Sequence, residues 1–108
     1  MIVTSCENII GKKIVKTVGL VKGNTVRARH IGRDIGAALR GIVGGEISEY
    51  TKLIAESREQ SIDRMIAQAE AVGANAIIMV RFSTSEIMKG AAELLAYGTA
   101  VIIENDQG

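Results

Sequence analysis

Apolar residues first form a regular pattern over residues 13 to 29, a stretch that is rich in β-branched side chains and interrupted at Gly23-Asn24. A Gly-X pair between two apolar runs suits a tight hairpin turn, because glycine accepts the positive φ that such turns require. We therefore expect strands over residues 13–21 and 25–29. Apolar side chains alternate onto both faces of this hairpin, so both faces need a cover.

Helical spacing then replaces the strand pattern. Apolar residues recur at intervals of three and four at Ile31, Ile35, Leu39 and Ile42. This spacing predicts a short amphipathic helix with Arg33, Asp34 and Arg40 on its polar side. A second apolar stripe predicts a long helix over residues 46–72; its members are Ile62, Met65, Ile66, Ala69 and Val72. The glycine that follows suits the left-handed position after a helix end.

Two further strands follow the long helix. In residues 74–87, alternation places Ile78, Val80 and Phe82 on one face, which we expect to pack against the helix stripe. Residues 94–104 carry larger side chains on one face and only small residues, Ala96, Gly98 and Ala100, on the other. So small a face indicates that another backbone approaches closely, and we expect this strand to border a contact between subunits.

The glycine pair Gly44-Gly45 lies between the two predicted helices. A phosphate-binding loop would require a GxxxxGK[ST] or GxGxxG pattern beside a strand, and neither is present. Glu46 and Glu49 in the first turn of the second helix would also compete with an incoming phosphate. The pair is therefore interpreted as a joint between helices.

The order of elements predicts an α+β fold with an antiparallel sheet and a helix layer on one face, within a single domain of 108 residues. One long and one short helix can cover only one face of such a sheet. The second apolar face therefore predicts a homo-oligomer, in which another copy of the chain supplies the missing cover.

Composition narrows the range of partners. The formal net charge is +1 and aromatic residues make up 3% of the chain, so the stacking platforms of single-stranded nucleic-acid binders are nearly absent. The longest central apolar run, AIIMV, is far below the ~20 residues of a membrane helix. A lone cysteine and the lack of a signal-peptide pattern point to a reducing, cytoplasmic setting. We expect neither a nucleic-acid nor a membrane partner.

Charge is distributed unevenly along the chain. Residues 12 to 40 hold eight basic side chains against the single acid Asp34, whereas the long helix is mainly acidic. These two regions could be solvated faces or could pair within one subunit, since surface charge is usually inert. Alternatively, the basic hairpin of one copy docks head to tail on the acidic helix of the next and closes a ring.

Several segments together resemble the YbjQ-like family of small bacterial proteins, whose label refers to heavy-metal binding. They are GKKIVKTVGLVKG, RDIGAALRGIVGGEISEY, SREQSIDRMIAQAEAVGANAIIMVRF and AYGTAVIIE. The resemblance covers nearly the whole chain, so residues 1–108 are expected to form one YbjQ-like domain. It implies a subunit fold similar to that of dodecin and a ring-shaped homopentamer. It implies architecture rather than an activity.

Metal ligands are scarce in this sequence. Soft-metal transport domains use a CxxC pair, which a chain with one cysteine cannot supply. In one interpretation, Cys6 is an inert thiol and His30 is a hydrogen-bonded residue at the entry of a helix. In the other, five copies of Cys6 or His30 gather around a metal through the symmetry of a ring. No motif in the sequence identifies a cofactor.

The sequence favours a function without catalysis. His30 has no nucleophile or orienting acid in a recognisable motif. We expect a homo-oligomeric module that binds a small anionic ligand or a partner, with Arg33, Asp34, Arg40 and Tyr50 around a charged pocket near the glycine joint. The same arginines could instead form an ion-pair network between subunits with Glu49. A metal-binding protein that uses Cys6 and His30, and an enzyme with a composite site between subunits, are the alternatives.

Overall fold

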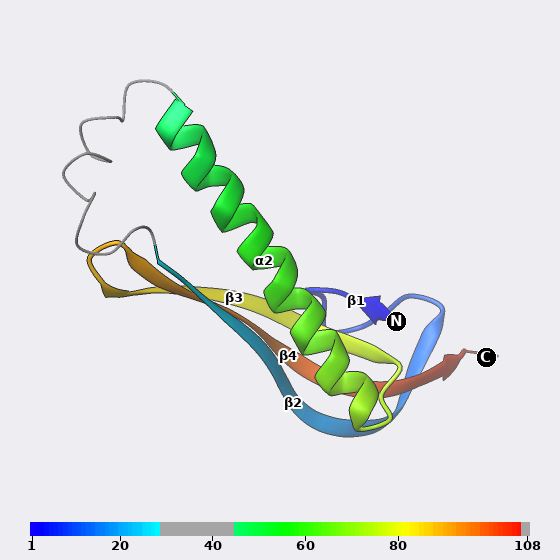
Figure 1. Ribbon diagram of the computed structural model, residues 1–108. Helices are drawn as coiled ribbons and strands as arrows, with labels where there is room; N and C mark the ends of the chain where they lie inside the picture. The colour runs from blue at the N-terminus through cyan, green and yellow to red at the C-terminus, as the bar shows by residue number, and fades with distance from the viewer. Residues whose placement is uncertain (29–44, 107–108) are drawn as a thin grey trace.

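The computed structural model describes residues 1–28 and 45–106, with side chains for residues 1–27 and 51–106 (Figure 1). Its elements are β1 (Ile2–Val3), β2 (Lys12–Ala28), α2 (Gly45–Ala71), β3 (Ala76–Met88) and β4 (Ala91–Asn105). The predicted first helix lies outside the described residues. Within the described part, an α+β arrangement of one sheet and one helix is present, which confirms the predicted fold class.

The four strands form one open, mixed sheet in the order β1-β3-β4-β2. β4 is antiparallel to both β2 and β3, whereas β1 pairs in parallel with β3 through Ile2↔Ala76 and Val3↔Ile77. The prediction of a purely antiparallel sheet is therefore wrong at this edge. The two-residue strand β1 was missed because it is too short to show a period.

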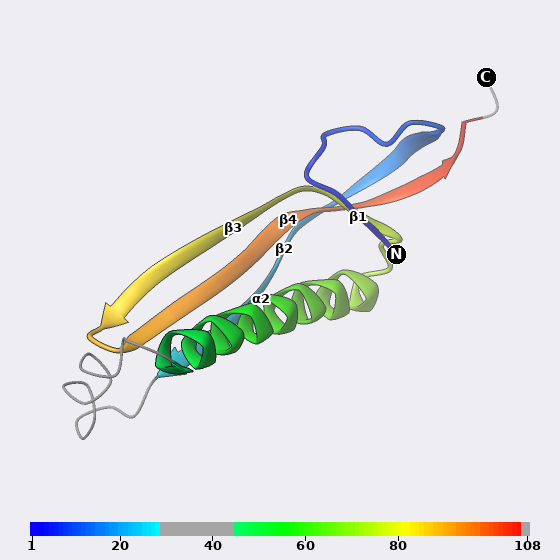
Figure 2. The same ribbon diagram turned by 90° about the horizontal axis from the view of Figure 1, so that it is seen from above.

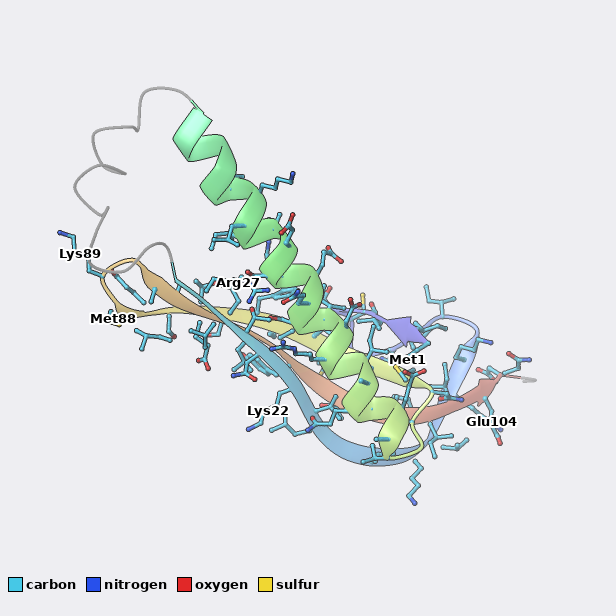
Figure 3. The ribbon with its side chains drawn as sticks, in the orientation of Figure 1. Met1, Lys22, Arg27, Met88, Lys89 and Glu104 are labelled. Carbon is cyan, nitrogen blue, oxygen red and sulfur yellow. The ribbon has the colours of Figure 1, made fainter. Side chains whose placement is uncertain are left out.

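The helix α2 lies along one face of the sheet, over β2 and β4 (Figure 2). The segment between β1 and β2 passes to the opposite face. The molecule measures 60 × 23 × 16 Å and its radius of gyration is 17.8 Å. A compact domain of this length would have a radius of about 13 Å. The single chain is therefore far more elongated than a self-sufficient globular domain, and Met88 and Lys89 lie at the opposite end of the sheet from Glu104 (Figure 3).

The predicted turn at Gly23-Asn24 is wrong, because β2 continues without interruption from Lys12 to Ala28. Gly23 pairs with Ala96 of β4 in the middle of the sheet. A Cβ atom on Gly23 would overlap the backbone oxygen of Ser61 and the backbone nitrogen of Met65. The glycine is thus required by the close approach of α2 to the sheet rather than by a turn.

The long helix confirms its prediction. It spans Gly45–Ala71 and ends in a Schellman motif, in which the N–H of Gly73 donates to Glu70 at 3.0 Å and that of Ala74 donates to Ala69 at 3.0 Å. Gly73 has a φ of 84°, the left-handed conformation that the sequence predicted for it. Ala69 and Ala74 are both buried in the core that this ending closes.

Strand β3 contains a bulge that changes which residues share a face. The register runs from Ile78↔Thr99 to Arg81↔Tyr97, so β3 carries one residue more than β4 across this step. Met79, with a φ of 55°, lies in the bulge. Ile77 and Val80 consequently join the core under α2, and Ile78 joins a second cluster on the other face.

The predicted grouping of Ile78, Val80 and Phe82 is therefore wrong for Ile78. Phe82 pairs with Ala96 and so lies on the same face as Val80. However, its side chain remains 50% exposed, because α2 packs over β2 and β4 and hardly reaches β3. The expectation that Phe82 is a buried core residue is wrong for the single chain.

The small-sided face of β4 faces α2 of its own chain. Ala96 and Ala100 are fully buried in one cluster with Met65 and Ala69. A Cβ on Gly98 would lie 2.8 Å from Cγ2 of Ile77 and 2.9 Å from the backbone oxygen of Ile78, at the start of the bulge. The helix and the bulge explain why these residues are small. The expected close backbone is therefore that of the same chain, and the predicted subunit contact along this strand stays a prediction.

Candidate functional site

The residues predicted to form a charged pocket fall mainly outside the described part of the chain. Arg33, Asp34 and Arg40 lie there, as does His30. Tyr50 belongs to α2, which begins at Gly45, and the structure does not describe its side chain. The charged pocket therefore stays a prediction.

Cys6 lies in the segment between β1 and β2, and its free thiol is exposed. The backbone of this residue is fixed at both ends: its N–H donates to Oγ1 of Thr4 at 3.1 Å, and its carbonyl accepts from the N–H of Met79 at 3.0 Å. Met79 is itself 43% exposed, so a thiol and a thioether belong to residues that are directly hydrogen-bonded. The sequence does not show this backbone contact, because it joins the segment after β1 to the bulge in β3.

Residues 1–28 and 45–106 contain no group of three or more histidine, cysteine, aspartate or glutamate side chains arranged to hold a metal ion. A metal at Cys6 would therefore need ligands from outside this set, such as symmetry-related copies of the same thiol.

Buried hydroxyl groups lie where α2 meets β2 and β4. Thr25, Ser57 and Ser61 are 0–1% exposed. Oγ1 of Thr25 donates to the carbonyl of Ser57 at 3.2 Å and lies 3.2 Å from Oγ of Ser61, which also lies 3.2 Å from the carbonyl of Leu94. These groups satisfy one another and lie out of reach of solvent, so they fix the helix on the sheet rather than serve as nucleophiles.

Side chains of α2 also protect the outer edge of β2. Oε1 of Gln68 accepts the N–H of Lys22 at 2.7 Å, and Nη1 of Arg64 donates to the carbonyl of Asn24 at 2.6 Å. The guanidinium of Arg27 donates to the side-chain oxygen of Gln60, a contact between two side chains. The bonds to Lys22 and Asn24 use backbone groups that an edge strand would otherwise offer to another chain. The helix therefore blocks the middle of the β2 edge against strand pairing.

The face of the sheet opposite α2 is largely uncovered, and on it large apolar side chains lie among polar ones such as Lys22, Asn24 and Glu93. We call the residues Leu20, Val26, Leu95 and Tyr97 the back face. The pairs Leu20↔Thr99, Lys22↔Tyr97, Asn24↔Leu95 and Val26↔Glu93 place them on one side. Leu20 is 70% exposed and Val26 52% exposed. At one end of this face lies the cluster of Ile78, Val101 and Ile103, and Ile9 packs over that cluster.

A groove lies between α2 and the edge of the sheet formed by β1 and β3. Its volume is about 300 Å³, and its lining residues are Val3, Thr4, Ser5, Ile62, Val80 and Phe82. The groove exists because α2 lies over β2 and β4 and leaves β3 uncovered. Its walls are mostly apolar, and its polar lining comes from the chain just after β1. It was not predicted, because it depends on β1 and on the bulge in β3.

Among the described residues, no helix is both long enough and apolar enough to cross a membrane.

Comparisons with known proteins give consistent matches over nearly the full chain. The YbjQ family model, described as "Putative heavy-metal-binding", matches residues 1–104. A UPF0145 protein from Dehalococcoides mccartyi is 62% identical over 104 residues, which are 96% of this chain and 100% of that protein. A UPF0145 protein from Methanosarcina acetivorans is 52% identical over 105 residues, which are 97% of this chain and 99% of that protein.

The second relative comes from an archaeon, so the expectation of a purely bacterial family was too narrow. Among solved structures, a protein from Pediococcus pentosaceus, described as a member of the DUF74 family with unknown function, superposes with a TM-score of 0.65. That match covers 96% of this chain and 98% of the other at 15% identity. At this identity the likeness concerns the fold alone.

Proposed function

The chain belongs to the YbjQ-like family, and from this premise we propose that it acts as a homo-oligomeric, non-catalytic binding module. One domain over residues 1–108 forms the subunit. Copies of it assemble into a closed ring, and the family resemblance sets their number at five. The ring holds a small anionic ligand or a partner at sites completed by contacts between copies, in a cytoplasmic setting.

The exposed apolar side chains of the back face are the observation that carries this proposal. Leu20 and Val26 are 70% and 52% exposed beside the half-buried Leu95 and Tyr97. Full burial of a large apolar side chain contributes about 1.5–3 kcal/mol. A second copy laid on this face would therefore gain several such contributions. A solvated single chain would gain none of them.

The topology supports the ring. Without β1, three antiparallel strands in the order β3-β4-β2 lie under one helix, which is the arrangement that a dodecin-like subunit requires. The elongation of the chain supports it too, because a subunit of 60 × 23 × 16 Å exposes much surface that neighbouring copies can cover.

Light scattering with mass resolution tests the assembly. We expect a species of about five times the 11.5 kDa chain. Leu20→Glu places a charge on the back face and should dissociate it, whereas Ala67→Glu places the same charge on the exposed surface of α2 and should not. A wild-type monomer at micromolar concentration would contradict the proposal.

The ligand site is proposed at Arg33, Asp34, Arg40 and Tyr50, beside the Gly44-Gly45 joint. Two arginines with one aspartate suit an anion that also offers a hydrogen-bond donor. Small molecules that copurify with the wild-type protein should be identified by mass spectrometry and should be lost from an Arg33→Ala, Arg40→Ala variant. Retention of the same molecule by that variant would place its site elsewhere.

Metal binding is a second candidate function, and the exposed thiol of Cys6 favours it. Met79, whose N–H donates to the carbonyl of Cys6, is a second exposed residue with a soft ligand atom, and copies of His30 would complete the ligand set by symmetry. Calorimetric titration with Cu(I) should show binding that Cys6→Ser abolishes. The fold itself should not depend on this metal, so EDTA should leave the thermal midpoint unchanged. Equal binding by the Cys6→Ser variant would reject the candidate.

A further inference from the structure

Ile10 is the most exposed large apolar side chain in the described part of the chain. Its relative exposure is 101%, so its own chain gives it no cover. It occupies the tip of the turn from Ile9 to Lys12, which we call the knob turn. This turn lies at the end of the sheet that contains the last residues of β4 (Figure 1).

The knob turn is held firmly. The N–H of Lys12 donates to the carbonyl of Ile9 at 3.1 Å, and the N–H of Asp106 donates to the carbonyl of Gly11 at 3.0 Å. Gly11 has a φ of 84°, which suits the third position of a type II turn. Ile9 packs on the cluster that contains Ile78, Val101 and Ile103, and this contact anchors the turn on the sheet. Ile10 therefore projects from a fixed base, with little conformational freedom left to lose on binding.

The groove described above is the complementary feature. It offers about 300 Å³ between Ile62 of α2 and Val80 and Phe82 of β3. Phe82 is 50% exposed along it, although an aromatic ring at this position would normally be buried. The same chain thus carries one apolar projection and one apolar recess. A projection and a recess on different parts of one molecule generate a head-to-tail contact between copies.

We propose that Ile10 of one copy inserts into the groove of the next copy, so that each subunit completes the groove of its neighbour. The proposal rests on the assembly proposed above and names one of its contacts. A rotation that closes the repeated contact gives a ring rather than a filament. The groove of a single chain is then an incomplete site, and Ile10 of the neighbour covers the apolar residues that line it.

Charged residues beside both features allow pairs between the two copies. Lys16 follows the knob turn on β2, and Asp63 follows Ile62 on α2; both are exposed. Each rim also carries the opposite sign, because Glu104 lies opposite Lys13 and Arg81 donates to the carbonyl of Ser5 in the groove. A pair between Lys16 and Asp63 would therefore steer two copies into one orientation more than it adds affinity.

Disulfide trapping tests the contact directly. In a Cys6→Ser background, Ile10→Cys and Ser5→Cys are introduced together, and the oxidised protein is separated under denaturing, non-reducing conditions. The proposal predicts covalent trimers and larger species, up to the size that light scattering gives for the native assembly. Each single-cysteine variant is the control, since one cysteine per chain can link no more than two chains.

The outcomes separate the contact from the assembly. An assembly that remains intact in solution but gives only dimers from the two-cysteine variant would overturn the knob contact and leave the proposed oligomer standing. A monomeric protein would overturn both.

A second measurement does not depend on cysteine chemistry. Ile10→Ser should raise the dissociation constant of the assembly about 10- to 100-fold, because one large apolar side chain per contact loses its burial. Ile10→Leu, which keeps an apolar side chain at the tip, should change it little. The variant subunit should fold normally, since Ile10 is uncovered by its own chain. An unchanged dissociation constant for Ile10→Ser would contradict the proposal.

Discussion

The two faces of the sheet differ in how far the chain itself covers them. Under α2, Gly23, Ala96 and Ala100 bring the helix backbone almost onto the strands, and larger residues such as Val21 and Leu94 fill the space beside them. On the opposite face, Leu20 and Val26 extend into solvent among polar side chains. The face under α2 is therefore complete within one chain, whereas the back face leaves large apolar side chains that another surface can cover.

The largest effect is expected at Gly23. Gly23→Val would place side-chain atoms against the backbone of Ser61 and Met65, where there is no flexible group that can move aside. We expect a loss of more than about 3 kcal/mol in the free energy of unfolding, or failure to fold. Urea denaturation measures it. Thr17→Val, at an exposed position of the same strand, is the control and should lie within about 0.5 kcal/mol of wild type.

Met65 tests the same face through its side chain. It is fully buried between α2 and the sheet, so Met65→Ala should lower the free energy of unfolding by about 2–5 kcal/mol. Met88→Ala removes the same atoms at the exposed end of β3, where Met88 is 52% exposed, and should cost under about 1 kcal/mol. Equal costs at the two positions would show that the distal end of the hairpin is also covered in the protein in solution.

The buried hydroxyl cluster should give a smaller loss. Ser61→Ala removes a hydroxyl that lies 3.2 Å from both Thr25 Oγ1 and the carbonyl of Leu94. We expect a cost of about 1–3 kcal/mol, because a buried acceptor is left without a partner. Ser83→Ala, on an exposed part of β3, is the matched control. A neutral Ser61→Ala would mean that the hydroxyls are not needed to hold α2 on the sheet.

Phe82 gives the smallest expected effect and bears on the groove. Because half of its side chain is exposed, Phe82→Ala should cost about 1–2 kcal/mol in the separated chain, below the 3–5 kcal/mol of a buried aromatic residue. We propose to measure it in the Ile10→Ser background and again in the wild-type assembly. A larger cost in the assembly is expected if a neighbouring copy covers the ring. The same cost in both would indicate that the groove stays open.

The sequence predicted several elements well because their signals are local. The stripe of Ile62, Met65 and Ala69 repeats at the helical period over many turns, and Gly73 ends the helix through its own conformation. The two long strands after the helix also showed their alternation. For the predicted pocket, the sequence indicated Arg33, Asp34 and Arg40, which lie outside the described part of the chain.

Patterning along the chain determined by itself the α+β class, the long helix and the presence of two apolar sheet faces. Tertiary structure decided the rest. Gly23 reads as a turn in sequence, yet it is the point where a helix touches a strand, and only the distance between two remote segments distinguishes these roles. The bulge at Met79 likewise moved Ile78 to the opposite face, and the backbone of Met79 hydrogen-bonds to that of Cys6. A pattern records the periodicity of one segment, whereas close approach and register depend on two segments at once.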